Sequence, residues 1–526
     1  MSLYSLGFVV FMLALLAAYY ATGRLLGRGQ WVVLLLGSLC YYCLAGSWQT
    51  LVYVLFCAVV TWLVPLALKH MDRLCAAERE ACDDRAARKR AKARWQRRKQ
   101  AVMLLGLLMA FGVLAQLKYW NVILYQLGQA SSPRSLGLLL PLGISFYTFQ
   151  SVSYLLDVYR GSDEAETNFL RHLLFVTYFP QMIQGPINRH AELAPQLLAY
   201  HAWDTQRARR ALPLIGYGML KKFLMADLLV GPISRLLDAP DAAAMPGSWA
   251  VLAILMYSAQ QYGDFSGGID MVEGISELLG IQMAPNFRRP YFATSLADFW
   301  RRWHISLGQW MRDYVFYPVA LTRPLRALGK RAGRAGEHLG RTLPACLANI
   351  LVFLIVGAWH GAQAHFIVWG LYNGLVIALA DLLKPAFSAA AQRLGIDSRS
   401  RGWHVASVIR TFLVVNVGWY FDRVESFSLS LALLRSSVLS FGAAELPRLW
   451  SSALLSRAEH AQILLAVAMA VAVFCVSLCQ ERGHQVRTRL LAWPLPLRWA
   501  LYAFVGLLVV ATSVLHVGGG FMYANY

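Results

Sequence analysis

Apolar stretches close to the length that crosses a bilayer recur along the whole sequence. A membrane-spanning helix needs about 20 consecutive apolar residues. The chain has 526 residues, of which 58% are hydrophobic and 15% are charged, unlike a soluble globular domain. The pattern predicts an all-α polytopic integral membrane protein with about a dozen spans. The expected spans are residues 5–22, 31–45, 49–68, 101–127, 137–157, 168–187, 211–237, 248–263, 343–360, 364–384, 403–421, 461–480 and 496–517.

Basic residues give the chain a net charge of +21, and they gather in a few segments that flank the apolar stretches. The densest is the basic loop 69–100, which we expect to be helical and solvated. Lysine and arginine are enriched in the cytosolic segments of membrane proteins, so this loop is predicted to be cytosolic. The anionic headgroups of membrane lipids account for its charge, and no nucleic-acid partner is expected.

Counting spans outward from this loop gives a predicted orientation. The N-terminus and the C-terminus are both expected outside, and the last span delivers residues 521–526 to the outer side. The end of span 343–360 is expected to lie toward the outer leaflet.

The spans leave no room for a separate soluble domain, so we expect a single membrane domain over residues 1–526. Residues 1–68 form N-terminal spans, and residues 376–526 form C-terminal spans and an outer tail. In region 135–375, by contrast, Gly, Pro, aromatic and ionisable residues interrupt the apolar segments. Irregular backbone at membrane depth is tolerated only where it is buried in protein or lines a cavity, so the functional site is expected in this region.

The cysteine pattern and the absence of known catalytic motifs argue against several kinds of site and enzyme. The eight cysteines lie in apolar spans or in the basic loop and imply no disulfide framework. Cys40 and Cys43 lack a second ligand pair, so no metal site is predicted. The sequence has no Gly-x-Ser-x-Gly elbow, His-Glu-x-x-His helix or Walker lysine loop, which argues against the usual hydrolase, metalloprotease and NTPase mechanisms.

Segment 286–319 combines Trp, Arg and His in a pattern typical of an amphipathic helix. Ser295 is a suitable N-cap with Asp298 three residues later, so one helix is expected from this point. Helical spacing puts Trp303 and His304 on the same side. A helix lying at the cytosolic interface also accounts for the tryptophans and arginines, but it accounts less well for a histidine on the aromatic side.

His360 lies near the end of the apolar segment 343–361. Ionisable residues inside a membrane domain are costly and usually serve a transport path, an ion pair or a reaction. A histidine can remove a proton from an alcohol near neutral pH, which helps the alcohol to attack a thioester carbonyl. The alternative is a neutral imidazole that only hydrogen-bonds to a neighbouring helix. The sequence does not show whether His304 and His360 meet.

Five segments together resemble the membrane-bound O-acyltransferase family, and specifically its bacterial branch of alginate and peptidoglycan O-acetylation proteins and teichoic-acid D-alanyl transferases. They cover about residues 135–375 in the family order. The segments are Pro141–Tyr147, Phe179-Pro180 with Gln184–Ile187 and Arg189, Tyr262–Gly268, Asn286–Pro318 and Gly357–Gly361.

The resemblance implies a ring of transmembrane and re-entrant helices around a thin centre, with a cytosolic cavity for the acyl donor and an outer funnel for the acceptor. His360 is similar to the family's catalytic histidine, and His304 is similar to its second histidine. By resemblance, His360 is expected to act as general base and His304 to assist binding or orientation. The residues expected to bind substrate are Arg302, Trp303, Tyr262, Asp264 and Trp359.

The C-terminal Phe521-Met522-Tyr523 resembles the Phe-Ile-Tyr ending found in this branch or on small partner proteins, where a tyrosine is thought to carry the acyl group outward. Tyr523 is therefore a candidate covalent acyl carrier, and Gly518–Gly520 would let the tail bend back into the outer funnel. The replacement of Ile by Met departs from the pattern. The alternative is an outer tail that packs at the membrane interface.

The resemblance also implies the reaction and its setting. We expect transfer of an acyl group, specifically acetyl, from acetyl-CoA or another cytosolic acyl thioester to hydroxyls of an exported polysaccharide or cell-wall polymer. The expected location is the bacterial cytoplasmic (inner) membrane, with an extracellular esterase-like transferase as partner and no tightly bound cofactor.

Two alternatives remain open at this stage. One is D-alanyl transfer to teichoic acid from a carrier protein. The other is transport of a lipid-linked sugar, with the histidines in a proton path. The main support for the transport alternative is an acidic group formed by Asp264, Asp270 and Glu273. These carboxylates could equally pair with nearby arginines, namely Arg288, Arg289 or Arg301.

Overall fold

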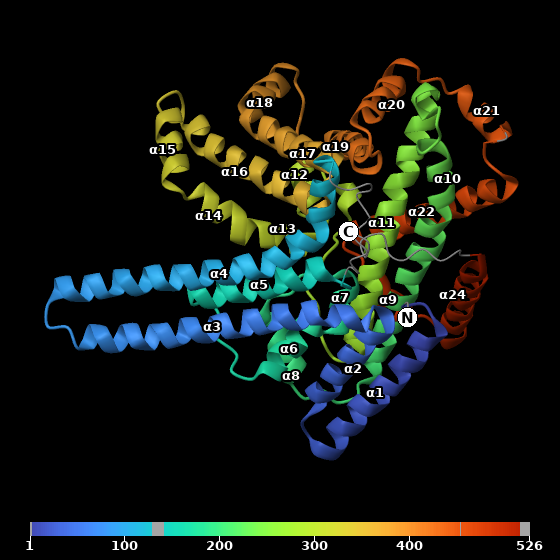
Figure 1. The fold of residues 1–526 in the computed structure, drawn as a ribbon. Coiled ribbons are helices and arrows are strands. Elements are labelled where there is room, and N and C mark those ends of the chain that lie inside the picture. Colours follow the sequence, from blue (N-terminus) through green and yellow to red (C-terminus); the bar gives the residue numbers. More distant parts are fainter. Residues whose placement is uncertain (1–2, 129–140, 453, 516–526) are drawn as a thin grey trace. The chain divides into compact units, whose positions relative to one another are not determined.

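The computed structural model describes residues 3–128, 141–452 and 454–515. Within these ranges the chain is almost entirely helical, with 24 α-helices joined by short 3-10 and π-helical segments (Figure 1). No β-strand is formed in the described ranges, and the β-type pairing there is one isolated bridge between Phe287 and Trp303. The predicted all-α fold class is confirmed.

The chain divides into two compact units, which are described separately. The first unit comprises residues Met1–Ala211 and Val272–Ala284, and the second comprises Leu212–Met271 and Pro285–Tyr526. This division does not test whether the chain folds as the single membrane domain expected from the sequence, which stays a prediction.

The first unit is built from the N-terminal helices. Helices α9 (Thr205–Leu220) and α11 (Gly247–Leu278) each contribute one end to it. Its other elements are α1 (Leu6–Leu26), α2 (Gln30–Ala45), η1 (Trp48–Thr50), α3 (Leu51–Glu80), α4 (Arg85–Gln126), α5 (Ile144–Arg160), α6 (Phe169–Thr177), α7 (Phe179–Gln184) and α8 (His190–Leu198).

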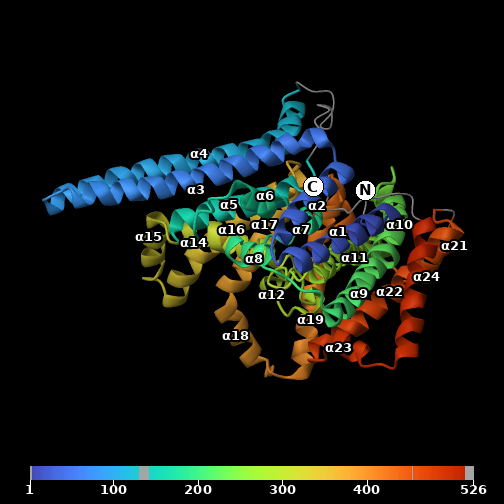
Figure 2. The ribbon, with the colours of Figure 1, turned by 90° about the horizontal axis from the view of Figure 1, so that it is seen from below.

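Helices α3 and α4 form a long antiparallel hairpin whose far end carries the basic segment (Figures 1 and 2). The expected loop 69–100 is mostly helical, as its sequence indicated, and the connection itself is limited to residues 81–84. Ala91 is buried, and ion pairs Glu78–Arg94 and Asp72–Lys99 tie the two helices together. The remaining basic side chains of this segment are largely exposed.

The prediction of a single helix over residues 168–187 is wrong. This segment is divided into α6 and α7, and the chain turns at Tyr178, whose backbone lies outside the helical region. Pro180 follows directly at the start of α7, and proline disfavours a continuous helix through the residues before it. Helix α5 likewise begins only at Ile144, after Gly143 in a left-handed conformation, where an added methyl would overlap the carbonyl of Met182.

The second unit holds the remaining elements. They are η2 (Lys221–Asp227), α10 (Leu228–Leu237), η3 (Ala242–Ala244), η4 (Pro290–Phe292), α12 (Leu296–Trp300), α13 (Ile305–Met311), η5 (Arg312–Phe316), α14 (Tyr317–Ala320), α15 (Arg323–Ala332), α16 (Glu337–His360), α17 (Ala364–Leu382), α18 (Lys384–Arg393), α19 (Arg401–Arg423), α20 (Phe427–Leu439), α21 (Glu445–Ser451), α22 (Arg457–Glu481), α23 (Val486–Leu491) and α24 (Leu495–Leu515).

Seven helices of the described chain are long and apolar enough to cross a membrane, and two shorter apolar helices, α2 and α20, accompany them. The number is smaller than the dozen spans expected, because several expected spans are broken or carry buried polar residues. The seven lie in α1, α3, α4, α16, α17, α22 and α24. Together with the all-helical fold they identify a multi-pass membrane protein.

Helices α16 and α17 pack so closely that glycine is required at their crossing. A methyl group added at Gly370 would overlap the carbonyl oxygen of Phe353, and one added at Gly357 would overlap that of Phe366. Small residues at such positions let helix backbones approach within a membrane protein. This contact holds the end of α16, and with it His360, against α17.

We predict that Gly370→Ala lowers the free energy of unfolding by about 1–3 kcal/mol, because the extra methyl has no space and the helices must separate. Denaturant titration in mixed micelles measures the effect. Gly506→Ala in α24 is the matched control, since a methyl there meets open space and alanine favours the helix by up to about 1 kcal/mol. Equal losses for the two variants would contradict the close packing of α16 and α17.

Candidate functional site

The expected single helix after Ser295 is interrupted at His304. Helix α12 ends at Trp300, α13 begins at Ile305, and His304 between them has a left-handed backbone with φ of 48°. The predicted cap is confirmed, because the Asp298 amide donates to the Ser295 hydroxyl at 3.1 Å.

The interruption has a cause that lies elsewhere in the chain. The Arg288 amide donates to the Arg302 carbonyl at 2.9 Å, and the Ile305 amide donates to the Asn286 carbonyl at 3.0 Å. This short antiparallel pairing takes residues 302–304 out of the helical path. The prediction of one continuous helix was therefore wrong.

The imidazole of His304 is buried among aromatic and amide groups. Its ring lies 4.8 Å from the Phe265 ring and 5.8 Å from the Trp359 ring, measured between centroids. Its Nδ1 is 3.2 Å from the Asn286 side-chain oxygen. Burial lowers the pKa of His304 to about 3, so the ring is neutral in the physiological range.

His360 is the last residue of α16 and is also buried. Its ring lies 4.9 Å from Trp359 and 5.0 Å from Trp369 of α17. Trp359 therefore contacts both imidazoles, and the structure brings His304 and His360 to one aromatic cluster. This proximity is what the sequence could not show.

Trp303 and Tyr262 lie in the same aromatic core. Trp303 is fully buried and stacks on Phe299 with 5.5 Å between centroids, and Tyr262 lies 6.1 Å from it. Trp300 had no predicted role, yet its indole nitrogen donates to the Asn373 side chain at 3.1 Å. That bond joins α12 to α17.

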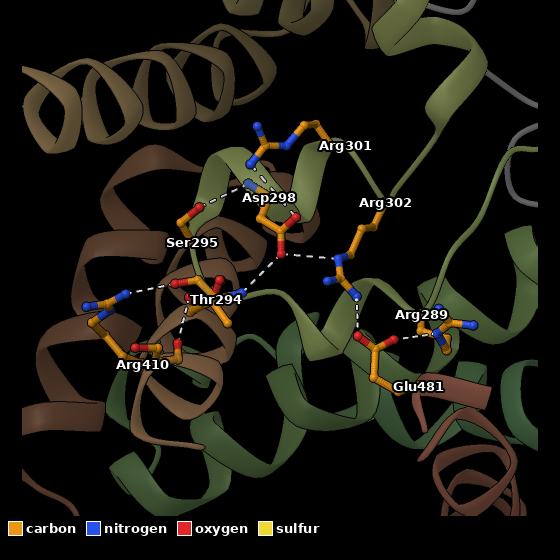
Figure 3. A network of polar contacts seen from close by, with 10 residues as sticks. Arg289, Thr294, Ser295, Asp298, Arg301, Arg302, Arg410 and Glu481 are labelled. Carbon is orange, nitrogen blue, oxygen red and sulfur yellow. Dashed lines mark hydrogen bonds and ion pairs between the residues drawn. The ribbon is translucent and has the colours of Figure 1, made fainter. Parts of the chain in front are cut away.

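Arg302 belongs to a polar network next to this core (Figure 3). Its guanidinium pairs with Asp298 at 3.1 Å and with Glu481 at 3.1 Å. Glu481 also accepts a hydrogen bond from Arg289 at 2.5 Å. The expected role of Arg302 in substrate binding stays a prediction, and the observed contacts tie the loop before α12 and the residues after it to the end of α22.

Asp264 pairs with a lysine, not with the arginines considered from the sequence. The Lys222 ammonium lies 2.6 Å from Asp264 and 2.7 Å from Asp227. Lys221 pairs with Asp270 at 2.7 Å. The alternative considered from the sequence, pairing with nearby arginines, is therefore replaced by pairing of Asp264 with Lys222 and of Asp270 with Lys221.

Lys221 and Lys222 were missed in the sequence although a signal was present. Both lie inside the expected span 211–237, where an ionisable residue is rare and needs a partner. They occupy the π-helical turn η2, and both are buried. Lys221 also lies 5.6 Å from the centre of the Tyr262 ring, so the charged cluster borders the aromatic core.

The two remaining predictions concern Tyr523 and metal ligands. Tyr523 lies outside the described residues. Within the described ranges, no group of three or more His, Cys, Asp or Glu side chains is arranged to hold a metal ion.

Comparison with known proteins identifies the class of protein. Residues 162–332 match the membrane-bound O-acyltransferase family. A probable alginate O-acetylase of Pseudomonas syringae is 31% identical over 446 residues, which cover 82% of this chain and 74% of that protein. A peptidoglycan O-acetyltransferase of Helicobacter pylori is 29% identical, covering 81% and 83% of the two chains.

A more distant relative is the teichoic acid D-alanyltransferase of Bacillus subtilis, which is 26% identical and covers 54% of this chain and 69% of its own. Taken with the helical fold, these similarities show that the chain belongs to the membrane-bound O-acyltransferase family. It is a membrane-bound O-acyltransferase.

We predict that Lys222→Met lowers the free energy of unfolding by about 3–5 kcal/mol, because Asp264 and Asp227 would lose the charge that compensates their burial. Combining it with Asp264→Asn should recover part of the loss. Denaturant titration in mixed micelles measures both. Lys330→Met, on an exposed part of α15, is the control and should change stability by less than about 0.5 kcal/mol. A Lys222→Met protein as stable as the control would rule out this cluster as a stabilising element.

Proposed function

We propose that this enzyme transfers an acetyl group from acetyl-CoA, or from another acyl thioester on the cytosolic side, to hydroxyl groups of an exported polysaccharide or cell-wall polymer. The observation that carries the proposal is the pair of buried histidines, His304 and His360, that share contact with Trp359. The relatives named as alginate and peptidoglycan O-acetylating enzymes support acetyl as the group and a polymer as the acceptor.

The proposed reaction determines which bonds change and which proton the site must move. The acceptor hydroxyl oxygen attacks the thioester carbonyl carbon, a carbon–oxygen bond forms and the carbon–sulfur bond breaks. The hydroxyl proton must leave as the bond forms, and the thiolate must take up a proton. A histidine base near the hydroxyl can carry that proton between the two atoms. The thioester supplies the reactive acyl group itself, so the proposal requires no tightly bound cofactor.

His360 is the proposed general base, and His304 is the proposed partner that orients a substrate group. A pKa of about 3 makes His304 a weak proton acceptor, which suits hydrogen bonding better than proton storage. Trp303, Tyr262 and Trp359 are proposed to form the apolar wall of the site. Such a wall excludes water, which strengthens electrostatic interactions with the reacting atoms.

The predicted orientation assigns the donor and the acceptor of the proposed reaction to opposite sides of the membrane. The location proposed is the bacterial cytoplasmic membrane, with both termini outside. The basic hairpin would then lie on the cytosolic side near anionic lipid headgroups. The Tyr523 hydroxyl is the proposed first acceptor of the thioester's acyl group. An extracellular esterase-like transferase is proposed to take the group from Tyr523 and to pass it to the polymer hydroxyls.

A second candidate is D-alanyl transfer to teichoic acid from a carrier protein. The similarity to teichoic acid D-alanyltransferases favours it, but that similarity covers 54% of the chain, whereas the similarity to the alginate O-acetylase covers 82%. Acetyl transfer is therefore the better supported function.

We predict that the purified protein in nanodiscs takes radiolabel from acetyl-CoA and that His360→Ala lowers the rate of labelling by about 10²–10⁴-fold, because the base is lost. His404→Ala, an exposed histidine of α19, is the control and should keep the wild-type rate. Liquid scintillation of the protein, with mapping of the labelled peptide, measures the effect.

Label that disappears in Tyr523→Phe would support this tyrosine as the covalent carrier. Absence of label from acetyl-CoA, with transfer from a D-alanyl carrier protein, would overturn the acetyl assignment. A His360→Ala protein with full activity would overturn the proposed base.

A further inference from the structure

Asn286 lies at the centre of the contacts that hold His304, although its role was not apparent from the sequence. Its side chain is fully buried. The side-chain oxygen accepts hydrogen bonds from the Ser306 hydroxyl at 2.9 Å, the Ser306 amide at 3.2 Å and the His304 Nδ1 at 3.2 Å. The backbone oxygen of Asn286 accepts the Ile305 amide at 3.0 Å. One residue thus contacts the whole stretch 304–306.

The orientation of the Asn286 amide determines the tautomer of His304. The Ser306 backbone N–H can only donate, so the amide atom that faces it must be the oxygen and not the NH₂ group. Because that oxygen can only accept, the His304 Nδ1 beside it must carry its hydrogen. In a neutral imidazole the lone pair is then on Nε2.

The backbone of His304 adds a second reason for this arrangement. A left-handed conformation is uncommon for a residue other than glycine and persists only when the surrounding structure holds it. The hydrogen bonds from the 304–306 stretch to Asn286 provide that restraint. The ring neighbours Phe265 of α11 and Trp359 of α16 carry no charge, so neither can select the tautomer by charge.

We propose that Asn286 is a positioning residue that fixes His304 as the Nδ1–H tautomer and presents its Nε2 lone pair to a reacting group. The part that concerns catalysis rests on the proposed role of His304, whereas the tautomer does not. A positioning residue acts through another group, so its loss should affect the rate of the chemical step more than the binding of the thioester.

The first test reads the tautomer directly. Nitrogen NMR of histidine-labelled protein in nanodiscs, with the His304→Gln spectrum subtracted, isolates the His304 signals. The expected result is a protonated Nδ1 in the wild type and a gain of Nε2–H signal in Asn286→Leu, which removes the acceptor. A wild-type ring protonated on Nε2 would overturn the proposal, whatever the activity of the enzyme.

The second test separates positioning from a structural role. Asn286→Leu should lower kcat by about 10²-fold, with the KM for acetyl-CoA changed by less than about 3-fold. Asn286→Asp keeps an acceptor at the same place and should restore most of the rate. In a His304→Gln background, Asn286→Leu should add little, because the two residues act as one unit.

Asn416→Leu is the matched control, since Asn416 is a buried asparagine of α19 that bonds to Ser258. Any loss that it causes should multiply with that of His304→Gln. If the loss from Asn286→Leu multiplies in the same way, Asn286 is merely structural and the proposal fails. Full activity of His304→Gln would instead contradict the proposed function of His304, and the NMR result would still decide the tautomer.

Discussion

The pairing between residues 286–288 and 302–305 is the contact on which the centre of the second unit depends. Two backbone hydrogen bonds, Arg288 to Arg302 and Ile305 to Asn286, replace the helical hydrogen bonds that these residues would otherwise form. They separate α12 from α13 and leave His304 at the junction. Trp303, one residue earlier, is thereby placed in the aromatic core, and His304 is placed beside Trp359.

The polar residues around this centre follow one physical rule. A buried charge or hydrogen-bonding group needs a partner, because the surroundings cannot replace water. Lys222 is held between Asp264 and Asp227, Lys221 is paired with Asp270, and Arg302 is shared by Asp298 and Glu481. His304 meets the same requirement by remaining neutral, because burial lowers its pKa, and this leaves its ring able to accept a hydrogen bond.

Local sequence signals were sufficient for part of this architecture. The apolar runs predicted an all-α membrane protein, and Ser295 and Asp298 predicted a helix start. These features depend on residues close together in the chain. The five-segment resemblance added the family, which comparison with the alginate and peptidoglycan O-acetylating enzymes bears out.

The structural features that were not predicted from the sequence depend on contacts between segments far apart in the chain. The break at His304 arises from residues 286–288, which lie eight to ten residues before α12. Positions 301–305 contain no glycine or proline that would have predicted it. The partners of Asp264 and Asp270 lie on η2, far away in sequence, so arginines close by were considered first. The separation of α6 from α7 was more accessible, because Pro180 is visible in the sequence.

A cryo-electron microscopy structure of the protein with a non-hydrolysable acetyl-CoA analogue would locate the carbonyl carbon of the donor relative to His360. We predict that this carbon lies inside the aromatic cluster around Trp359, with space for an acceptor oxygen about 3–3.5 Å from it and within hydrogen-bond reach of the His360 imidazole. A donor bound with its carbonyl away from both histidines, for example beside Lys221 and Lys222, would contradict it.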